Sequence, residues 1–213
     1  MLQWLSEMDT KALLCLNGKH SPDWDTVMFW ISGKESWVPF YVFLLIIIIY
    51  RERPYRFIFT ILFVVIAATL SDQISVLIKD HLVQRFRPSH NPEIKNLLHF
   101  VNDYRGGPYG FVSSHAANVF GLAAFLSNQF KSYKWSLLLF FWAAVVSYSR
   151  IYLGVHYPLD IICGALLGAL IGIQCYVFRV RTAIRVERYF EIRKEKKADA
   201  MRRKNHQTRS TTP

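Results

Sequence analysis

Cysteine is scarce in this chain, and that scarcity excludes a disulfide-stapled fold. The 213 residues include three cysteines, Cys15, Cys163 and Cys175, which are too few and too scattered for a disulfide framework. Cys163 and Cys175 lie within one apolar run, where a free cysteine behaves as a small buried apolar residue. Stability is therefore expected to come from packing and not from cross-links.

Charged residues are sparse as well, and long stretches of the chain contain few or none. Only 19% of the residues are charged, while 52% are hydrophobic and grouped in runs. Residues 57–78 contain a single charge, Asp72, and as a helix they would extend ~33 Å, enough to cross a bilayer core. The chain is therefore predicted to be an integral membrane protein of one domain.

A secretory signal peptide and internal repeats are also missing from the sequence. The first sixteen residues lack a basic start followed by a clean apolar block, so the first span is expected to direct insertion by itself.

Acidic residues are in the minority, and the excess of positive charge lies near the C-terminus. The chain carries 26 Lys and Arg against 15 Asp and Glu, and from residue 179 onward there are twelve basic and four acidic residues. No aromatic-basic module accompanies this charge, so no nucleic-acid partner is expected. Residues 182–213 are predicted to form a basic cytoplasmic tail beside anionic lipid.

The hydrophobic runs predict an all-α, polytopic membrane bundle with about five transmembrane helices. The predicted spans are residues 35–50, 57–79, 114–130, 135–148 and 158–178. Residues 1–34 mix apolar and charged side chains and are predicted to form amphipathic interfacial helices. Simple anchoring is the expected role of this segment, with a lid or lipid gate as the alternative. Residues 35–181 then form the transmembrane core.

Short basic turns set the predicted orientation. The turns at residues 51–56 and 131–134 fall on the same side as the tail if there are five spans, and that side should be cytoplasmic. The loop at residues 80–112 and the junction at residues 149–160 then share the opposite face. In a bacterial inner membrane that face is periplasmic or external.

The junction between the last two spans concentrates ionisable groups where apolar segments meet water. Pro158 suits the first position of a helix, so His156 would precede that helix and Asp160 would lie in its first turn. The carboxylate can then accept the proton of one imidazole nitrogen and leave the other as a base or nucleophile. Arg150 offers a planar fork for phosphate oxygens. Each residue alone would suit an interface anchor or a helix cap, but the cluster at membrane depth favours function.

Two further clusters precede this junction. Asp72, Ser75 and Lys79 recur at helical spacing and share one face, which fits either a site or helix-to-helix hydrogen bonding. Arg85 and Arg87 follow them.

The third predicted span opens with Ser113, Ser114 and His115. Ser113 is a natural N-cap, and free N–H groups at a helix N-terminus bind phosphate well. His115, in the first turn, could give a proton to a leaving group. Alone, this motif also fits a capped helix with an interfacial histidine.

Together, the three clusters resemble the signatures of the type 2 phosphatidic acid phosphatase superfamily, lipid phosphatases that share a core with vanadium haloperoxidases. Ser149-Arg150, five residues, His156, three residues and Asp160 reproduce the third signature. Ser113-Ser114-His115 resembles the second, Pro-Ser-Gly-His. Lys79 through Arg87-Pro88 resembles the first, and the resemblance covers residues 57–178.

Two departures from the family pattern matter. Val112 and Ser114 stand where the family has proline and glycine, although Ser114 keeps its backbone N–H. Lys79 lies eight residues before Arg87 instead of seven, and on a continuous helix one extra residue turns a side chain by ~100°. A single-turn bulge or an early helix end would absorb the offset. Otherwise Asp80 occupies the lysine position. Lys79 is the favoured phosphate ligand.

The resemblance implies a mechanism without a metal or other cofactor. His156 would attack phosphorus to form a phosphohistidine, with Asp160 orienting its ring, and His115 would protonate the leaving group and then activate water. The phosphate oxygens would be held by a set of five residues: Lys79, Arg87, Ser113, Ser114 and Arg150. The spacing of His90, Glu93, His99 and Asp103 fits no known metal site.

The resemblance therefore predicts a membrane phosphatase of the bacterial type, acting on a lipid phosphate or diphosphate. Family frequency alone places undecaprenyl diphosphate first and phosphatidylglycerol phosphate second, with phosphatidic acid and lipid A as other family substrates. The alternative is a non-catalytic carrier or assembly protein that keeps the pocket without turnover. The sequence does not indicate an oligomeric state.

Overall fold

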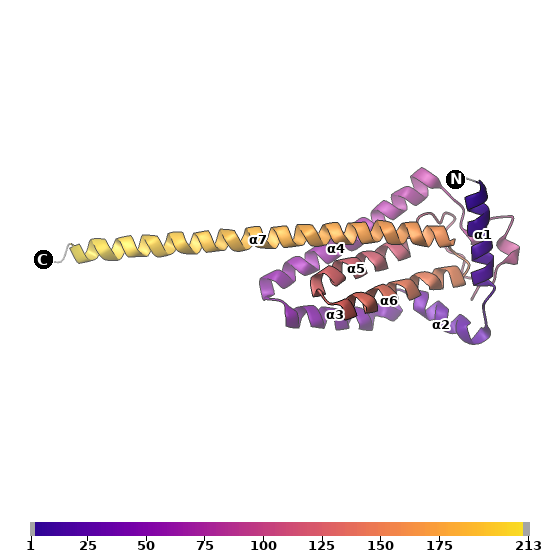
Figure 1. The fold of residues 1–213 in the computed structure, drawn as a ribbon, viewed down its shortest axis with the longest axis horizontal. Coiled ribbons are helices and arrows are strands. Elements are labelled where there is room, and N and C mark those ends of the chain that lie inside the picture. The colour runs from indigo at the N-terminus through magenta and orange to yellow at the C-terminus, as the bar shows by residue number, and fades with distance from the viewer. Residues whose placement is uncertain (1–2, 211–213) are drawn as a thin grey trace. The chain divides into compact units, whose positions relative to one another are not determined.

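A computed structural model describes residues 3–210, and its regular elements are helices (Figure 1). Among these residues, the only β pairing is an isolated bridge between Phe86 and Tyr109. The chain divides into two units at the bond between Tyr176 and Val177. The helical elements are α1 (Gln3–Asn17), α2 (Pro22–Ser32), η1 (Glu35–Trp37), α3 (Val38–Arg51), α4 (Pro54–Leu77), η2 (Ile78–Val83), η3 (Pro88–His90), η4 (Lys95–Leu97), α5 (Ser114–Phe130), α6 (Tyr133–Tyr152) and α7 (Pro158–Ser210).

The predicted all-α membrane bundle is confirmed, with a helix in each of the five predicted spans. Three helices are long and apolar enough to cross a bilayer: α4 with its extension to Val83, α6, and α7. The pair α2 and α3, bent by 77°, would make a fourth span if it crosses as one. α5 has 17 residues, which is at the lower limit for spanning. The predicted count of about five is therefore approximate.

Proline starts several of these helices. Pro22, Pro54 and Pro158 open α2, α4 and α7, where the missing N–H is not needed and the fixed φ suits the first turn. α5 begins differently, because the side chain of Ser113 accepts a hydrogen bond from the N–H of Ala116. This is the N-cap that the sequence predicts at Ser113.

α5 lies at the centre of the first unit. It packs against α4 and α6, and its small residues allow α7 to approach closely. A Cβ atom added at Gly168 would lie 1.9 Å from the carbonyl oxygen of Ala117, and one at Gly172 would lie 2.2 Å from that of Gly121. Together with Gly164 these glycines form a small-residue stripe, the usual means by which membrane helices bring their backbones together.

The core and the outward faces of the helices have opposite surroundings. Phe125, Leu139 and Trp142 are buried in the main hydrophobic cluster. Large apolar side chains such as Ile58 on α4 and Phe141 on α6 are instead 63% and 66% exposed. Exposed apolar faces of this extent suit contact with lipid.

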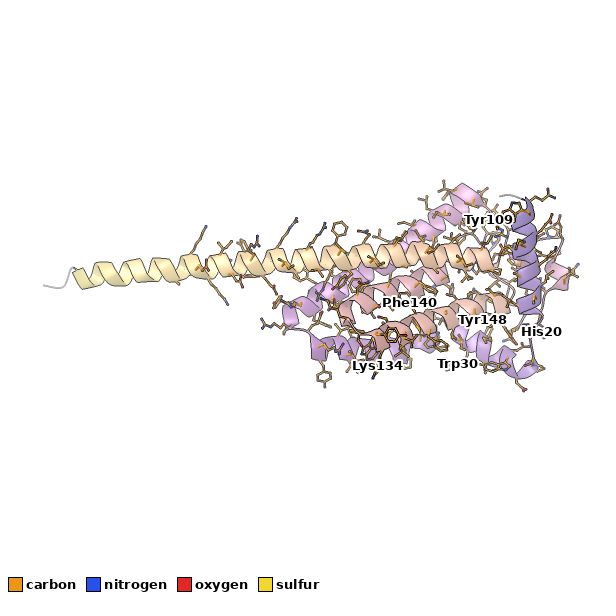
Figure 2. The ribbon with its side chains drawn as sticks, viewed as in Figure 1. His20, Trp30, Tyr109, Lys134, Phe140 and Tyr148 are labelled. Atoms are coloured by element: carbon orange, nitrogen blue, oxygen red, sulfur yellow. The ribbon has the colours of Figure 1, made fainter. Side chains whose placement is uncertain are left out.

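α6 separates the basic turn from the residues of the third signature. Lys134 and Tyr148 lie at opposite ends of this helix (Figure 2), and the junction containing His156 follows the Tyr148 end. This is the arrangement that the predicted orientation requires.

α1 is anchored by buried polar residues as well as by apolar ones. It lies across the end of the bundle near the start of α7 (Figure 1). Leu13 is fully buried, and Asn17 donates to the carbonyl oxygens of His99 and Tyr152 and accepts from the N–H of His99. α1 is therefore packed against the loop and junction that carry the site residues.

The second unit is a single helical stretch. Residues 177–210 continue α7, and the side chains described extend to residue 198. Apolar residues such as Phe178 and Phe190 alternate with basic ones. The predicted tail at residues 182–213 thus begins within a helix.

Candidate active site

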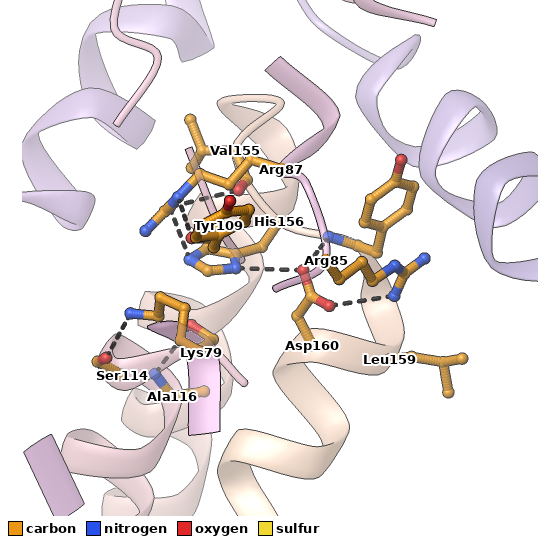
Figure 3. Close-up of polar contacts among 12 residues, drawn as sticks. Lys79, Arg85, Arg87, Tyr109, Ser114, Ala116, Val155, His156, Leu159 and Asp160 are labelled. Atoms are coloured by element: carbon orange, nitrogen blue, oxygen red, sulfur yellow. Dashed lines mark hydrogen bonds and ion pairs between the residues drawn. The ribbon is translucent and has the colours of Figure 1, made fainter. Parts of the chain in front are cut away.

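His156 and Asp160 form a buried pair at the start of α7. Nδ1 of His156 lies 3.3 Å from Oδ2 of Asp160, and both side chains are almost fully buried. The same oxygen accepts the N–H of Tyr157 at 3.0 Å. Pro158 begins the helix between them, so the local chain geometry expected from the sequence is present (Figure 3).

Arg87 lies on the other side of the imidazole. Its Nη1 is 2.9 Å from Nε2 of His156, and its Nε donates to the carbonyl oxygen of Tyr109 at 3.0 Å. A guanidinium can only donate, so Nε2 must accept and carry no proton. The proton therefore resides on Nδ1 and points toward Asp160. This is the tautomer that a nucleophilic Nε2 needs.

The electrostatic surroundings keep His156 neutral. Burial, followed by the positive charge of Arg87, lowers the pKa of His156 well below its ordinary value of 6.5. Burial also lowers the pKa of Arg87, but a guanidinium stays charged near neutral pH. A neutral imidazole thus faces a permanent cation.

The π-helix η2 resolves the one-residue offset of Lys79. The α-helical part of α4 ends at Leu77, and the π-helical turn spans Ile78–Val83. Such a turn accommodates an extra residue without rotating the rest of the helix. Nζ of Lys79 lies 2.8 Å from Oγ of Ser114 (Figure 3). Lys79, and not Asp80, is therefore the residue that reaches the start of α5.

The two serines at the start of α5 make different contacts. Ser114 accepts from Ser75 at 2.7 Å and from Lys79. Ser113, expected to contact phosphate, is fully buried and caps the helix through the N–H of Ala116. His115 follows in the first turn and lines the same cavity as Lys79 and Arg87.

Arg150 is buried, and its guanidinium has partners on α2 and in the long loop. Its guanidinium donates to Ser32 and, at 3.0 Å, to the hydroxyl of Tyr104. The Nε of Arg150 has no partner among the described residues. α2 and the long loop thus position an arginine that the sequence placed in the site.

A cavity of about 780 Å³ lies inside the bundle and is lined by several of the site residues. Its polar lining includes Lys34, Lys79, Arg87, Ser114 and His115. Its apolar lining follows α3, α4 and α5 through residues such as Leu44, Val64 and Phe125. Anion-binding groups at one part and an apolar groove at the other suit an amphipathic ligand with an acidic headgroup.

Several site residues were not predicted from the sequence. Arg85 donates to Oδ1 of Asp160 at 3.1 Å and to Asp9 at 2.8 Å. Asp9, on α1, also accepts the N–H of Leu159 at 2.9 Å. Lys34 and Tyr104 were missed as well. Their one signal is a charged or tyrosine side chain in an otherwise amphipathic or loop segment, and that signal is too common to single them out.

The loop residues considered as metal ligands are not grouped as such a site. His99 pairs with Asp25 at 2.9 Å and stacks on His20. Among the side chains that the structure describes, no cluster of three or more His, Cys, Asp or Glu residues is placed to hold a metal ion.

Comparison with known proteins gives consistent matches over most of the chain. The family model described as PAP2 superfamily matches residues 57–183. A lipid A 4'-phosphatase of Bacteroides thetaiotaomicron is 40% identical over 88% of this chain and 84% of its own length. A protein of the same name from Porphyromonas gingivalis is 35% identical over 80% of this chain and 72% of its own.

More distant matches carry other names. An undecaprenyl-diphosphatase of Sulfolobus acidocaldarius is 33% identical over 66% of this chain and 62% of its own length. The crystal structure of a transmembrane PAP2-type phosphatidylglycerolphosphate phosphatase from Bacillus subtilis aligns with a TM-score of 0.63 and 18% identity, covering 84% of this chain and 88% of that one. This last likeness concerns the fold.

Proposed function

Because this chain belongs to the PAP2 superfamily and is a membrane lipid phosphatase of that family, we propose that it hydrolyses the 4'-phosphate ester of lipid A. The proposal follows the two relatives that carry this name and align with most of the chain. Undecaprenyl diphosphate, which family frequency alone favours, is named by relatives that match at lower identity over less of the chain. We therefore place it second.

The observation that carries a phosphatase mechanism is the pair of contacts on His156, with Arg87 at Nε2 and with Asp160 at Nδ1. Because Arg87 can only donate, this pair assigns the proton to Nδ1 and leaves Nε2 free to attack phosphorus. Nε2 forms a bond to phosphorus while the bond from phosphorus to the lipid oxygen breaks. Asp160 then balances the positive charge of the phosphorylated ring.

The remaining residues are assigned by position. Lys79, Arg87 and the backbone N–H of Ser114 would hold the equatorial phosphate oxygens, and Arg150 would add positive charge. Preorganised donors of this kind stabilise the transition state directly. His115 would protonate the departing lipid oxygen and then take a proton from the attacking water, which replaces Nε2 on phosphorus. Ser113 would act by capping α5.

The offset of Lys79 could indicate a pocket that binds phosphate without turnover, which is the carrier alternative. Lys79 in η2 nevertheless contacts Ser114, so the offset is no argument against an enzyme. The carrier and the enzyme differ in one measurable respect, because only the enzyme releases phosphate.

The test is a substrate panel on the purified protein in detergent. Lipid A, undecaprenyl diphosphate, phosphatidylglycerol phosphate and phosphatidic acid are supplied separately, and released phosphate is measured. We expect the highest kcat/KM with lipid A and no detectable release by His156→Ala. His81→Ala, a change at an exposed histidine, serves as the matched control. Activity is expected to survive chelators and to be inhibited by vanadate.

Two outcomes would contradict parts of this proposal. Lipid binding without phosphate release by the unsubstituted protein would favour the carrier. A higher kcat/KM for undecaprenyl diphosphate would leave the phosphatase intact but replace its substrate.

A further inference from the structure

A continuous series of buried charges connects α1 to the imidazole of His156. Asp9 is 4% exposed and receives Nη2 of Arg85 at 2.8 Å. Nη1 of the same guanidinium donates to Oδ1 of Asp160 at 3.1 Å, and Oδ2 of Asp160 faces Nδ1 of His156 (Figure 3). The guanidinium is thus shared between two carboxylates, only one of which contacts the histidine.

We propose that Asp9 is a positioning residue for the reaction: through Arg85 it sets the orientation and the effective charge of Asp160, and so the reactivity of His156. This inference rests on the proposed phosphohistidine route. It assigns a role in the reaction to the first helix, which the sequence alone suggests to be an interfacial anchor.

The orientation follows from the two hydrogen bonds on Asp160. Arg85 occupies Oδ1, and the backbone N–H of Tyr157 occupies Oδ2, so the carboxylate plane is fixed from both sides. Arg85 is itself held by Asp9 and by stacking on the Tyr157 ring at 3.8 Å. Because Nη1 and Nη2 of Arg85 are both hydrogen-bonded to carboxylates, the guanidinium cannot rotate toward the phosphate.

The charge argument is separate from orientation. A phosphorylated imidazole carries positive charge, which Asp160 must balance. Arg85 alone would neutralise Asp160 and leave no negative charge for the ring. Asp9 restores it, because the two carboxylates and one guanidinium retain one net negative charge. In a buried site of low dielectric, one unit of negative charge changes the electrostatic energy of the phosphorylated ring strongly.

Asp9 also ties this charge to the backbone of the junction. Its Oδ1 accepts the N–H of Leu159, in the first turn of α7. A carboxylate at a helix N-terminus accepts a hydrogen bond from a free backbone N–H, and its negative charge interacts favourably with the helix dipole. Burial raises the pKa of Asp9 above its ordinary value, and the bonds from Leu159 and Arg85 offset only part of that rise. α1 therefore fixes the helix that carries Asp160 as well as the side chain itself.

The test compares Asp9→Asn with Glu7→Gln. Both changes remove one carboxylate from α1, but Glu7 is exposed and serves as the control. In Asp9→Asn the side-chain oxygen can still accept the N–H of Leu159, so that contact with the backbone is kept. We expect Asp9→Asn to lower kcat by roughly 10- to 100-fold, by analogy with the loss of a hydrogen-bond partner behind a metal ligand, with little change in KM. Asp9→Glu should recover part of the loss, and Glu7→Gln should match the unsubstituted protein.

A double-substitution cycle tests whether Asp9 acts through Arg85. If it does, adding Asp9→Asn to Arg85→Gln should have little further effect on kcat, because coupled residues are not additive. Full additivity would overturn the proposal. So would an unchanged kcat in Asp9→Asn, or a fall in rate that only follows the fraction of folded protein measured by thermal unfolding.

Vanadate binding separates this inference from the choice of substrate. Calorimetric titration with vanadate reports the reactivity of His156 without lipid turnover, and Asp9→Asn is expected to weaken it about tenfold or more. If no lipid in the panel is hydrolysed, the proposed function fails while this comparison still decides the role of Asp9. Equal vanadate affinity in both proteins, or none in the unsubstituted protein, would overturn the inference.

Discussion

The imidazole of His156 is useful as a nucleophile only when its proton sits on the nitrogen that faces away from the substrate. Arg87 and Asp160 enforce that condition from opposite sides of the ring. Arg87 contacts Nε2 directly. In the proposed mechanism, substrate entry would exchange one acceptor of Arg87, the imidazole, for another, a phosphate oxygen, and would leave Nε2 free to attack.

At the residue scale, Lys79 provides the most direct test of the phosphate pocket. Lys79→Ala should lower kcat/KM by about 10²-fold or more, because removal of one preorganised donor to a developing oxyanion has that effect. Lys79→Arg should retain more activity, since the charge is kept. The measurement is phosphate release at several substrate concentrations.

Lys95→Ala is the matched control for that substitution. Lys95 is an exposed lysine in η4, outside the lining of the cavity, so its removal changes the net charge equally without touching the pocket. A similar loss of rate in both variants would mean that general surface charge, and not a specific contact, attracts the substrate.

At the scale of elements, η2 is the feature that reconciles this sequence with its family. The extra residue between Lys79 and Arg87 lies in this π-helical turn. The spacing of the two residues can therefore exceed the family pattern while both side chains still reach the site. The position of the extra residue should therefore matter more than its presence.

Single-residue deletions on either side of Lys79 test this interpretation. Deleting Leu82, an exposed residue of η2, should convert the turn to α-helix, restore the family spacing and preserve most of the activity. Deleting Leu77, also exposed, should rotate Lys79 by ~100° and abolish its contact with Ser114. Phosphate release and thermal unfolding are measured for both proteins. Equal losses would show that η2 does not act as a spacer.

The contact of α5 with α7 brings the second and third signatures together. Gly168→Ala would place a methyl group 1.9 Å from the carbonyl oxygen of Ala117, which forces the helices apart. We expect a lower melting temperature and a loss of kcat, since overpacking a close helix contact costs about 1–3 kcal/mol. Gly107→Ala is the control, because nothing lies within 4 Å of its added Cβ. Full activity in Gly168→Ala would show that this contact does not position the site.

At the scale of the whole molecule, the sequence predicts what depends on periodicity and local spacing. The apolar runs indicate the helices, and Pro158 correctly predicts the start of α7 between His156 and Asp160. The family match confirms the resemblance drawn from the three signatures. The partners of the site could not be predicted, because Asp9 meets Arg85 only after α1 folds across the end of the bundle. Nothing in local spacing reveals a contact between residues so far apart.

Orientation in the membrane is the remaining property of the whole molecule that the charge pattern predicts. The basic turn at residues 131–134 and the site junction are at opposite ends of α6, so they should lie on opposite sides of the bilayer, with the basic turn in the cytoplasm. Gly107→Cys and Tyr133→Cys place single thiols at exposed positions of the loop and the turn, in a protein whose three cysteines are replaced by serine.

A membrane-impermeant maleimide added to intact spheroplasts should label Gly107→Cys at once and Tyr133→Cys only after permeabilisation. Labelling after permeabilisation is the control that both thiols are reactive. The reverse pattern would place the phosphate pocket in the cytoplasm, and it would require that the basic turns of this protein do not follow the usual charge rule. Labelling of both thiols before permeabilisation would mean that α5 does not cross the bilayer, since α5 is the helix that separates the two positions.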